Sequence, residues 1–332
     1  MAPATPLHRD GTMKAIVQDR YGSPTDVLQL KEVDKPVVDD DRVLVRIRAA
    51  SVNALDWHLT GGLARMVLGL RRPRIQIRGV DMAGHVEAVG KNVTRFKPGD
   101  EVFGSALGTF AEYATTSEDR LVPKPRSLTF EQAAAVPVAG FTALQGLRDK
   151  ARVKPGQRVL IYGAGGGVGT FTVQIAKSLG AHVTAVTSTE NLDLVRSLGA
   201  DELIDYTKED FTKREQRYDV LFDIGANRSL TDCRHVLSAK GTLVLAGAGS
   251  GPGLAPLTRI LKALALSPLV RQRLVPFVAK SRQEDLVALK DLVEARKLSP
   301  VIDRQYPLSG VPEAIRYVGT GHARGKVVIN VA

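Results

Sequence analysis

A short stretch near the middle of the chain constrains the fold more than any other feature of the sequence. Residues 159–162 form the apolar run Val-Leu-Ile-Tyr, and five of the seven residues that follow, 163–169, are glycine. The residues from Thr170 to Leu179 have the composition of a helix, and Gly180 stands where that helix would end. A buried strand that passes through a glycine loop into a helix is the opening unit of a doubly wound α/β sheet.

The glycine loop also predicts a binding site for a dinucleotide. Glycine lets the backbone turn tightly and approach a pyrophosphate, and the N-terminus of the helix offers N–H groups and a positive dipole end to the anion. Ala164 takes the place of the first glycine of a strict G-x-G-x-x-G pattern when Gly169 is aligned with the last. The cofactor contacts expected in the loop are those of Gly165, Gly166, Gly167 and Val168.

The residues after the next predicted strand, 182–187, bear on which dinucleotide is bound. An acid roughly twenty residues beyond the loop commonly binds the adenosine ribose of NAD. This chain has Thr187-Ser188-Thr189 there. The hydroxyl group of Ser188 can donate to a 2′-phosphate without repelling it, which favours NADPH over NADH. Glu190 follows directly and is equally well explained as an acid in the first turn of a helix.

Length and composition favour two folded domains in a reducing compartment. A chain of 332 residues, 44% of them hydrophobic, exceeds one ordinary core. The single cysteine, Cys233, cannot form an internal disulfide, and no Cys/His cluster has the spacing of a structural zinc site. No window of the sequence has the length and apolarity of a transmembrane helix. We expect a cytoplasmic protein that is a homodimer or a monomer.

The formal net charge of +11 raises the question of an anionic partner. Much of the charge lies in residues 65–78 and 259–282, where basic residues are mixed with apolar ones. The chain has neither the signature of a recognition helix nor an aromatic stacking platform, so we expect no nucleic-acid binding. Solvated helix faces that attract a phosphate-bearing cofactor are the simpler interpretation, and peripheral contact with a membrane is left open.

Strand and helix patterns divide the chain into two parts. Residues 13–132 have the period-two alternation of short strands, and residues 133–298 alternate between strands and helices, with helices predicted at 257–280 and 283–295. Thr129 and Gln132 form a predicted helix-capping pair at the boundary. Residues 299–332 return to strand, helix and strand and are expected to rejoin the first part. Alternating strands and helices predict a parallel sheet, so the fold class is α/β.

Four stretches resemble, in content and order, the medium-chain dehydrogenases/reductases. They are residues 50–58 (ASVNALDWH), 79–84 (GVDMAG), 96–104 (FKPGDEVFG) and the glycine loop. The chain looks like the zinc-independent branch that includes zeta-crystallin and the chloroplast-envelope quinone oxidoreductases. The resemblance covers residues 13–332. It implies a GroES-like β domain from residues 13–132 and 299–332, a Rossmann domain from 133–298, and a cleft between them for cofactor and substrate.

The resemblance also implies site residues. Asn53 and His58 would line the cleft near the nicotinamide as candidate catalytic residues, Thr142 would face the carboxamide end of the cofactor, and Tyr206 would face its nucleotide. Local alternatives stay open: Asn53 fixes a turn, His58 lies on a helix surface, and Thr142 bonds its own helix backbone. Three glycines that follow predicted strands, where ligands of open α/β sheets collect, are further candidate cofactor contacts: Gly225, Gly247 and Gly249.

Zinc-dependent relatives carry a Cys and a His-Glu pair in the first domain, and this chain has neither. Residues 53–56 contain no thiol, and Asp81 stands where the His-Glu pair is expected. A catalytic zinc needs three protein ligands, so we expect no metal. The resemblance then implies transfer of hydride from NADPH to a quinone, an enone or another activated double bond of a small apolar substrate. An enoyl-thioester reductase, a metal-free alcohol/aldehyde oxidoreductase, and a cofactor-binding protein that contacts RNA or a membrane surface stay open as alternatives.

Overall fold

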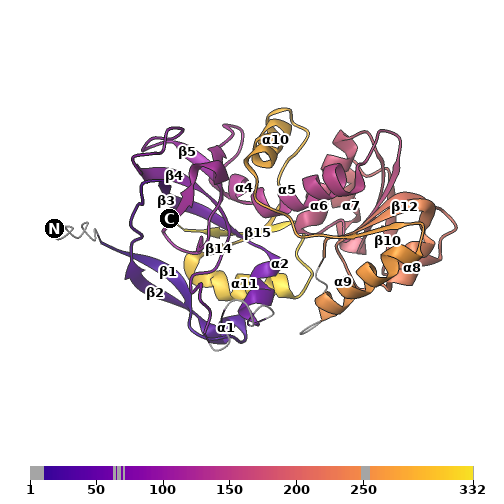
Figure 1. Ribbon diagram of the computed structural model, residues 1–332, viewed down its shortest axis with the longest axis horizontal. Coiled ribbons are helices and arrows are strands. Elements are labelled where there is room, and N and C mark those ends of the chain that lie inside the picture. The colour runs from indigo at the N-terminus through magenta and orange to yellow at the C-terminus, as the bar shows by residue number, and fades with distance from the viewer. Residues whose placement is uncertain (1–10, 63–64, 66–68, 70–71, 248–254, 332) are drawn as a thin grey trace.

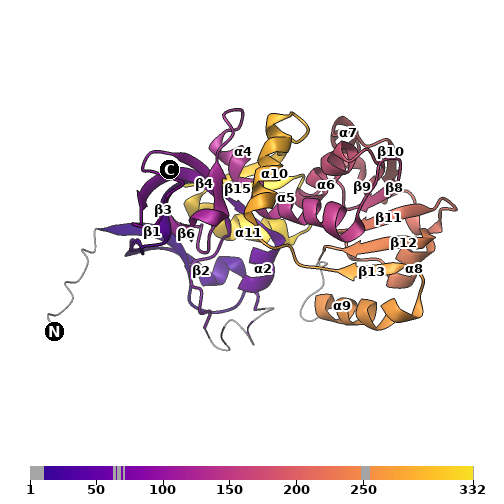
Figure 2. The same ribbon diagram turned by 45° about the horizontal axis from the view of Figure 1, so that its top comes forward.

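The structure, a computed structural model, describes residues 11–62, 65, 69, 72–247 and 255–331. Two lobes lie side by side, and each is built on its own β-sheet (Figures 1 and 2). The first lobe contains the early part of the chain together with its last strands, and the second lobe contains the middle. Within the described residues, no helix has the length and apolarity needed to cross a membrane.

Mainly antiparallel strands form the first lobe. Its larger sheet has the order β14-β15-β3-β4-β5-β7, and β6 also pairs with β3. β15 runs antiparallel to β3, so the C-terminal strands complete this lobe, as the sequence predicted. The strands are β3 (Arg42–Val52), β4 (Asp81–Val89), β5 (Glu101–Ser105), β6 (Tyr113–Ser117), β7 (Leu121–Pro123), β14 (Ile302–Pro307) and β15 (Lys326–Asn330), with a separate hairpin of β1 (Thr12–Gln18) and β2 (Leu28–Asp34).

Short helices cover the first lobe and lead into the second. They are α1 (Pro24–Val27), α2 (Ala54–Thr60), α4 (Phe130–Ala134) and α11 (Val311–Gly319). The predicted capping pair is confirmed at the start of α4, where the N–H of Gln132 donates to Thr129 Oγ1 at 3.3 Å and the N–H of Thr129 donates to Gln132 Oε1 at 3.0 Å. α4 packs against β3 and β4. α4 spans residues 132 and 133, where the domain boundary was expected, and the position of that boundary stays a prediction.

Six parallel strands form the sheet of the second lobe, in the order β10-β9-β8-β11-β12-β13. This order reverses between β8 and β11, as in the doubly wound dinucleotide-binding fold, and confirms the predicted Rossmann architecture. The strands are β8 (Arg158–Tyr162), β9 (His182–Thr187), β10 (Glu202–Asp205), β11 (Tyr218–Asp223), β12 (Leu237–Leu245) and β13 (Arg273–Pro276). The helices are α5 (Pro137–Leu144), α6 (Gly167–Ser178), α7 (Leu192–Ser197), α8 (Leu230–His235), α9 (Ala255–Leu266) and α10 (Gln283–Glu294), and a π-helical segment, Gln145–Ala151, follows α5.

The helix predicted at residues 257–280 is only partly helical, and this prediction was wrong. α9 ends at Leu266, a 3₁₀ turn follows at Ser267–Leu269, and β13 forms the last strand of the sheet. Pro268 lies in the turn and has no N–H to continue the helix. Leu274 of β13 is buried, and the strand pairs with β12, so tertiary pairing decided the structure of this segment.

The basic residues of this segment are also not all on a solvated face. The guanidinium of Arg259 turns inward, donates to the carbonyls of Ala226 and Arg228 at 2.8 and 2.6 Å, and pairs with the buried Asp223. Only 17% of the Arg259 side chain is exposed. Arg259 therefore holds the turn after β11. It does not belong to an exposed basic surface that could bind an anionic partner.

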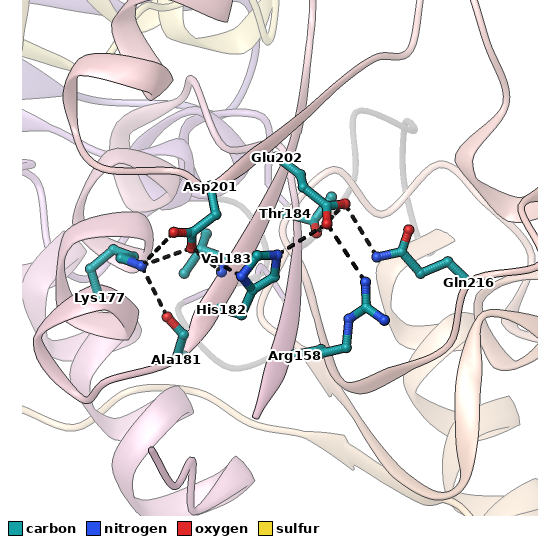
Figure 3. Close-up of polar contacts among 9 residues, drawn as sticks. All are labelled: Arg158, Lys177, Ala181, His182, Val183, Thr184, Asp201, Glu202 and Gln216. Carbon is teal, nitrogen blue, oxygen red and sulfur yellow. Dashed lines mark hydrogen bonds and ion pairs between the residues drawn. The ribbon is translucent and has the colours of Figure 1, made fainter. Parts of the chain in front are cut away.

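Charged side chains join the amino ends of three strands in the second lobe (Figure 3). Glu202 opens β10, and its carboxylate lies 3.0 Å from His182 Nε2 and 3.6 Å from Arg158, the first residues of β9 and β8. Its hydrogen bond with His182 is the main reason that the pKa of Glu202 is lowered. Ligands of open α/β sheets bind at the carboxyl ends of the strands. This cluster lies at the opposite edge, so we interpret it as structural.

Candidate active site

The glycine loop joins β8 to α6 at the carboxyl edge of the parallel sheet. Gly163 has φ +90°, and α6 follows Gly166 as its N-cap, so no side chain caps the first turn. A Cβ on Gly165 would lie 2.7 Å from the side chain of Asn191, whereas one on Gly166 would meet only the carbonyl oxygen of Gly163 at 3.6 Å. Neighbouring side chains fill the space beside Gly165, whereas the space beside Gly166 is open. This arrangement leaves room for a pyrophosphate at the N-terminus of α6.

Hydroxyl groups lie at the carboxyl ends of β9 and β10. Ser188 follows β9, and its Oγ accepts a hydrogen bond from Asn191 Nδ2 at 3.1 Å. Tyr206 follows β10, is 38% exposed, and has its ring edge-on to that of Tyr162. Both residues thus lie at the edge of the sheet where the adenosine end of a dinucleotide is expected.

Two charged residues beside this edge, Asp205 and Lys208, are paired with groups of the protein. Asp205 accepts hydrogen bonds from the hydroxyls of Thr189 and Thr207, which lower the pKa of Asp205 to about 2. Lys208 Nζ lies 3.5 Å from Asp205. Lys208 is therefore held by an acid of the protein, which makes it a weak candidate for binding a phosphate.

Asp81 is the centre of a buried polar network between the lobes. Its Oδ2 accepts hydrogen bonds from Ser51 Oγ at 2.8 Å and Asn53 Nδ2 at 2.9 Å, and lies 3.4 Å from Lys326 Nζ. Its Oδ1 accepts from the backbone N–H of Val138 at 3.0 Å, at the start of α5. The carboxylate thereby joins β3, β4 and β15 to a helix of the second lobe and neutralises the positive end of that helix.

Lys326 fixes the orientation of Asn53. Its ammonium group has an acceptor for each of its hydrogens: Asn53 Oδ1 at 2.7 Å, the carbonyl of Val52 at 3.3 Å and Asp81 Oδ2 at 3.4 Å. Burial lowers the pKa of Lys326, and the carboxylate of Asp81 opposes that shift. Because Lys326 holds the amide oxygen and Asp81 the amide nitrogen, the Asn53 side chain has one defined orientation. Among the residues that the structure describes, Asp81 is the one acceptor for the Asn53 amide nitrogen, so its second hydrogen remains as a donor.

The sequence prediction missed Lys326 and Asn191, which hold Asn53 and Ser188 respectively. A signal for Lys326 was present, because a lone lysine opens β15, where the next three residues are apolar and buried. The stem of Lys326 also lies against the glycine loop: a Cβ on Gly167 would be 3.2 Å from its Cδ. No local pattern marked Asn191, whose Oδ1 accepts a hydrogen bond from Arg324 Nε at 2.9 Å.

The other candidate residues have mixed outcomes. His58 lies on α2, is 8% exposed and packs edge-on against Trp57, so the alternative that placed it on a surface was wrong. Thr142 Oγ1 donates to the carbonyl of Val138 at 2.8 Å, which confirms the local bond proposed for it. Its oxygen lone pairs are not used by this bond.

The glycines after β11 and β12 have structural reasons to be glycine. A Cβ on Gly225 would lie 2.6 Å from the ring of Tyr162, and one on Gly247 would lie 2.0 Å from the carbonyl oxygen of Ile224. Their proposed contacts with a cofactor stay predictions. Gly249 lies outside the described residues.

Asp56 makes stability depend on pH near this site. Burial is the main cause that raises the pKa of Asp56 to about 7, while the N–H of Asn53, which donates to Asp56 Oδ2 at 2.8 Å, lowers it. The folded protein then binds this proton more tightly than the unfolded chain does. The contribution of this proton to the free energy of unfolding is complete below about pH 4 and is lost as the pH rises to about 7.

We expect Asp56→Asn to flatten this dependence, because the amide oxygen still accepts from Asn53 but does not titrate. Chemical denaturation at a series of pH values measures the slope, which one such group can change by up to about 1.4 kcal/mol per pH unit. The wild type should lose more stability than the variant between about pH 4 and pH 7. Equal slopes for the two proteins would show that Asp56 is ionised in the folded state across this range.

Within the described ranges, no group of three or more His, Cys, Asp or Glu side chains is arranged to hold a metal ion. Cys233 is buried in an apolar cluster of the second lobe, and burial raises the pKa of its thiol to about 12. The oxygens of Asp81 already accept the hydrogen bonds described above. The expectation that no zinc takes part stays a prediction.

Comparison with known proteins identifies the family. The family model for the alcohol dehydrogenase GroES-like domain matches residues 39–126, and a model described as zinc-binding dehydrogenase matches residues 198–329. The chain is 36% identical to the mouse (Mus musculus) NAD(P)H oxidoreductase RTN4IP1, mitochondrial, over 99% of this chain and 91% of that protein. The chain belongs to the medium-chain dehydrogenase/reductase superfamily, in its quinone-oxidoreductase-like branch.

Two further relatives support this assignment. The NADPH-dependent alkenal/one oxidoreductase, chloroplastic, of Arabidopsis thaliana is 35% identical over 96% of this chain and 79% of that protein. A quinone oxidoreductase structure from Coxiella burnetii superimposes with a TM-score of 0.85 at 30% identity, covering 97% of this chain and 100% of that one. The protein is therefore an oxidoreductase of the fold that the sequence predicted.

Proposed function

We propose that the protein reduces quinones or enones with NADPH and without zinc. The observation that carries the proposal is the open glycine loop beside the buried network of Asn53, Asp81 and Lys326, because a dinucleotide bound on that loop would lie next to fixed polar groups. The names of the Arabidopsis and Coxiella relatives, which specify an alkenal/one and a quinone oxidoreductase, support the substrate class.

NADPH, when bound, supplies a hydride from C4 of its nicotinamide. The protein binds the pyrophosphate with the first turn of α6, and Ser188 and Tyr206 offer hydroxyl groups near the ribose. The absence of an acid at the end of β9 supports NADPH over NADH, because a carboxylate there would repel a 2′-phosphate.

The chemistry of the available donors supports a conjugated acceptor. Without a Lewis acid, an isolated carbonyl is a poor hydride acceptor, so the substrate itself must be electrophilic. The free amide hydrogen of Asn53 can donate to the oxygen on which negative charge develops, and the imidazole of His58 can hold or protonate that oxygen.

A His58→Gln variant tests the role proposed for the imidazole: kcat for an enone should fall while the Kd for NADPH stays within about twofold.

A substrate panel tests the proposal. NADPH oxidation is measured with a quinone, an enone, an enoyl thioester and a simple ketone, each with and without a chelator, and zinc in the protein is measured by elemental analysis. We expect turnover of the quinone or enone that the chelator does not change. Turnover confined to the simple ketone, or activity lost with one stoichiometric zinc, would contradict the proposal. Fast turnover of the enoyl thioester alone would favour that alternative on the same fold.

The cellular location and the oligomeric state of the protein are predicted separately from its reaction. The prediction of a cytoplasmic protein that is a homodimer or a monomer rests on the sequence alone, and the names of two relatives place those proteins in mitochondria and chloroplasts. Sedimentation at equilibrium decides between monomer and dimer. The alternative of RNA or membrane binding through residues 259–282 receives less support, because Arg259 is committed to the protein interior.

A further inference from the structure

A hollow of about 260 Å³ lies between the π-helical segment after α5 and the residues that join β13 to α10. The joining residues cross from the second lobe toward the first (Figures 1 and 2). No residue of the glycine loop lines this hollow, so it is separate from the proposed cofactor site. Among the described residues, its charged lining consists of four basic side chains and one acidic side chain: Arg148, Lys150, Lys280, Arg282 and Asp149. We call this hollow the basic pocket.

A buried glutamine holds the two walls of the basic pocket together. Gln145 lies in the π-helical segment and is 4% exposed. Its Nε2 donates to the carbonyl of Lys280 at 2.6 Å, and its Oε1 accepts from the N–H of Lys280 at 3.1 Å. The same Nε2 donates to Asp285 Oδ2 at 2.8 Å, in the first turn of α10. The main chain at Lys280 is therefore fixed before a ligand binds, which lowers the cost of ordering a binding site.

Arg148 is neutralised by carboxylates of the protein. Its Nε donates to Asp149 Oδ1 at 2.6 Å, and its Nη2 donates to Asp149 Oδ2 at 2.9 Å. The same Nη2 donates to Asp285 Oδ1 at 2.5 Å, and the side chain of Asp285 is fully buried. Both acids are therefore committed to Arg148.

The other three cations of the basic pocket lack such partners. Lys150, Lys280 and Arg282 form no ion pair within the part of the chain that the structure describes. The hydrogen bond from Arg148 is the main cause that lowers the pKa of Asp149, and the charges of Arg282 and Lys150 lower it further. Arg282 and Lys150 thus approach the same carboxylate from the two walls. Like charges gathered in one hollow repel each other, and a bound anion relieves that repulsion.

We propose that the basic pocket binds a phosphate group that belongs to a small phosphate ester or a diphosphate. The planar guanidinium of Arg282 matches the geometry of a phosphate, and the two lysines add point charges. Sites for drug-sized ligands occupy about 300–1,000 Å³. A pocket of about 260 Å³ therefore accepts the phosphate end of a molecule and not a whole dinucleotide. Binding of phosphate here does not depend on the proposed reaction.

The position of the basic pocket connects it to the candidate active site. Ser281 lies between two of the pocket cations in sequence, and its Oγ is 2.7 Å from Ser105 Oγ at the end of β5 in the first lobe. Ser105 is the register partner of Asp81, the centre of the buried network. A phosphate held by Lys280 and Arg282 therefore fixes a segment that joins the second lobe to the strand beside that network.

Calorimetry tests the binding without turnover. Inorganic pyrophosphate is titrated into the wild type, Lys280→Gln, Arg282→Gln and the double variant, in the absence of cofactor. Lys240→Gln is the matched control, because Lys240 is an exposed lysine of β12 that does not line the pocket. Because pyrophosphate also resembles the centre of a dinucleotide, Gly166→Ala is titrated as well. Melting temperatures of all variants report on folding.

We expect the double variant to bind pyrophosphate at least about tenfold more weakly than the wild type does, and each single variant to lose part of that affinity. Lys240→Gln and Gly166→Ala should stay within about twofold of the wild type. Equal affinity of the wild type and the double variant would overturn the inference. Binding that is lost in Gly166→Ala and kept in the double variant would place pyrophosphate on the glycine loop and would also overturn it.

Steady-state turnover distinguishes two sources of the phosphate group. With saturating NADPH, pyrophosphate should raise the KM for an enoyl thioester of coenzyme A, but not for an enone without phosphate, if the group belongs to the acceptor. If the group belongs to a free regulator, pyrophosphate should change kcat for both acceptors by at least about twofold. Either effect should disappear in the double variant. An effect that persists there would contradict a role of the basic pocket, whereas a protein without turnover would contradict the proposed function and not the binding result.

Discussion

Lys326→Met should both destabilise the protein and slow its reaction. Methionine keeps the length of the side chain but removes the ammonium group, which leaves the buried carboxylate of Asp81 without its cation. Removal of one partner of a buried ion pair costs about 3–5 kcal/mol of stability. The amide oxygen of Asn53 also loses its donor, so the side chain can rotate. A small misplacement of such a group can lower kcat by about a hundredfold.

Denaturant unfolding and steady-state kinetics with NADPH and an enone measure the two effects. Lys91→Met is the matched control, because Lys91 pairs with Asp40 at 2.7 Å on the surface, with 72% of its side chain exposed. The control should lose less than about 1 kcal/mol. Lys326→Arg should restore part of the stability, since it keeps the charge. A Lys326→Met protein as stable and as active as the control would show that the network neither supports the fold nor positions Asn53.

Alanine at two glycines of the loop should separate cofactor binding from folding. Gly166→Ala places a methyl group where only the carbonyl of Gly163 lies within reach, at 3.6 Å, so the fold should tolerate it. If the pyrophosphate binds at the start of α6, as proposed, the same methyl group takes up space that the pyrophosphate needs. We therefore expect NADPH and NADH to bind at least about tenfold more weakly, with little change in melting temperature.

Gly169→Ala provides the contrast. Its methyl group would lie 2.1 Å from the carbonyl oxygen of Gly163, a backbone contact that cannot relax easily. Overpacking of this kind costs about 1–3 kcal/mol or more, so this variant should melt at a lower temperature. Thermal unfolding and cofactor titration of both variants measure the difference. If Gly166→Ala binds both dinucleotides as tightly as the wild type, the open face of the loop is not the cofactor site.

The fold could be predicted from local patterns because its decisive features are local. The apolar strand 159–162, the glycine loop and the following helix are contiguous, and they define the unit that the parallel sheet repeats. The capping pair of Thr129 and Gln132 is likewise a contact between neighbours in sequence. The segment 257–280 was mispredicted because β13 is decided by pairing with β12, which composition does not reveal.

The polar contacts of the candidate site join residues that lie far apart in the sequence. Lys326 and Asn53 are 273 positions apart, and Arg324 and Asn191 are 133 apart. No local pattern of about ten residues indicates that β15 returns to lie beside the glycine loop. The resemblance to the family supplied Asn53 and His58, but their hydrogen-bonding partners required the structure.

The most direct test of the central claim follows a labelled hydride. The protein is incubated with a cyclic enone, a chelator and NADPH that carries deuterium at C4, in either the R or the S position, and the product is analysed by mass spectrometry and NMR. We expect one of the two labelled cofactors to deliver its deuterium to the β-carbon of the saturated ketone, while the α-carbon takes its proton from water. Product without deuterium from either cofactor, or no product from any enone or quinone, would contradict the account.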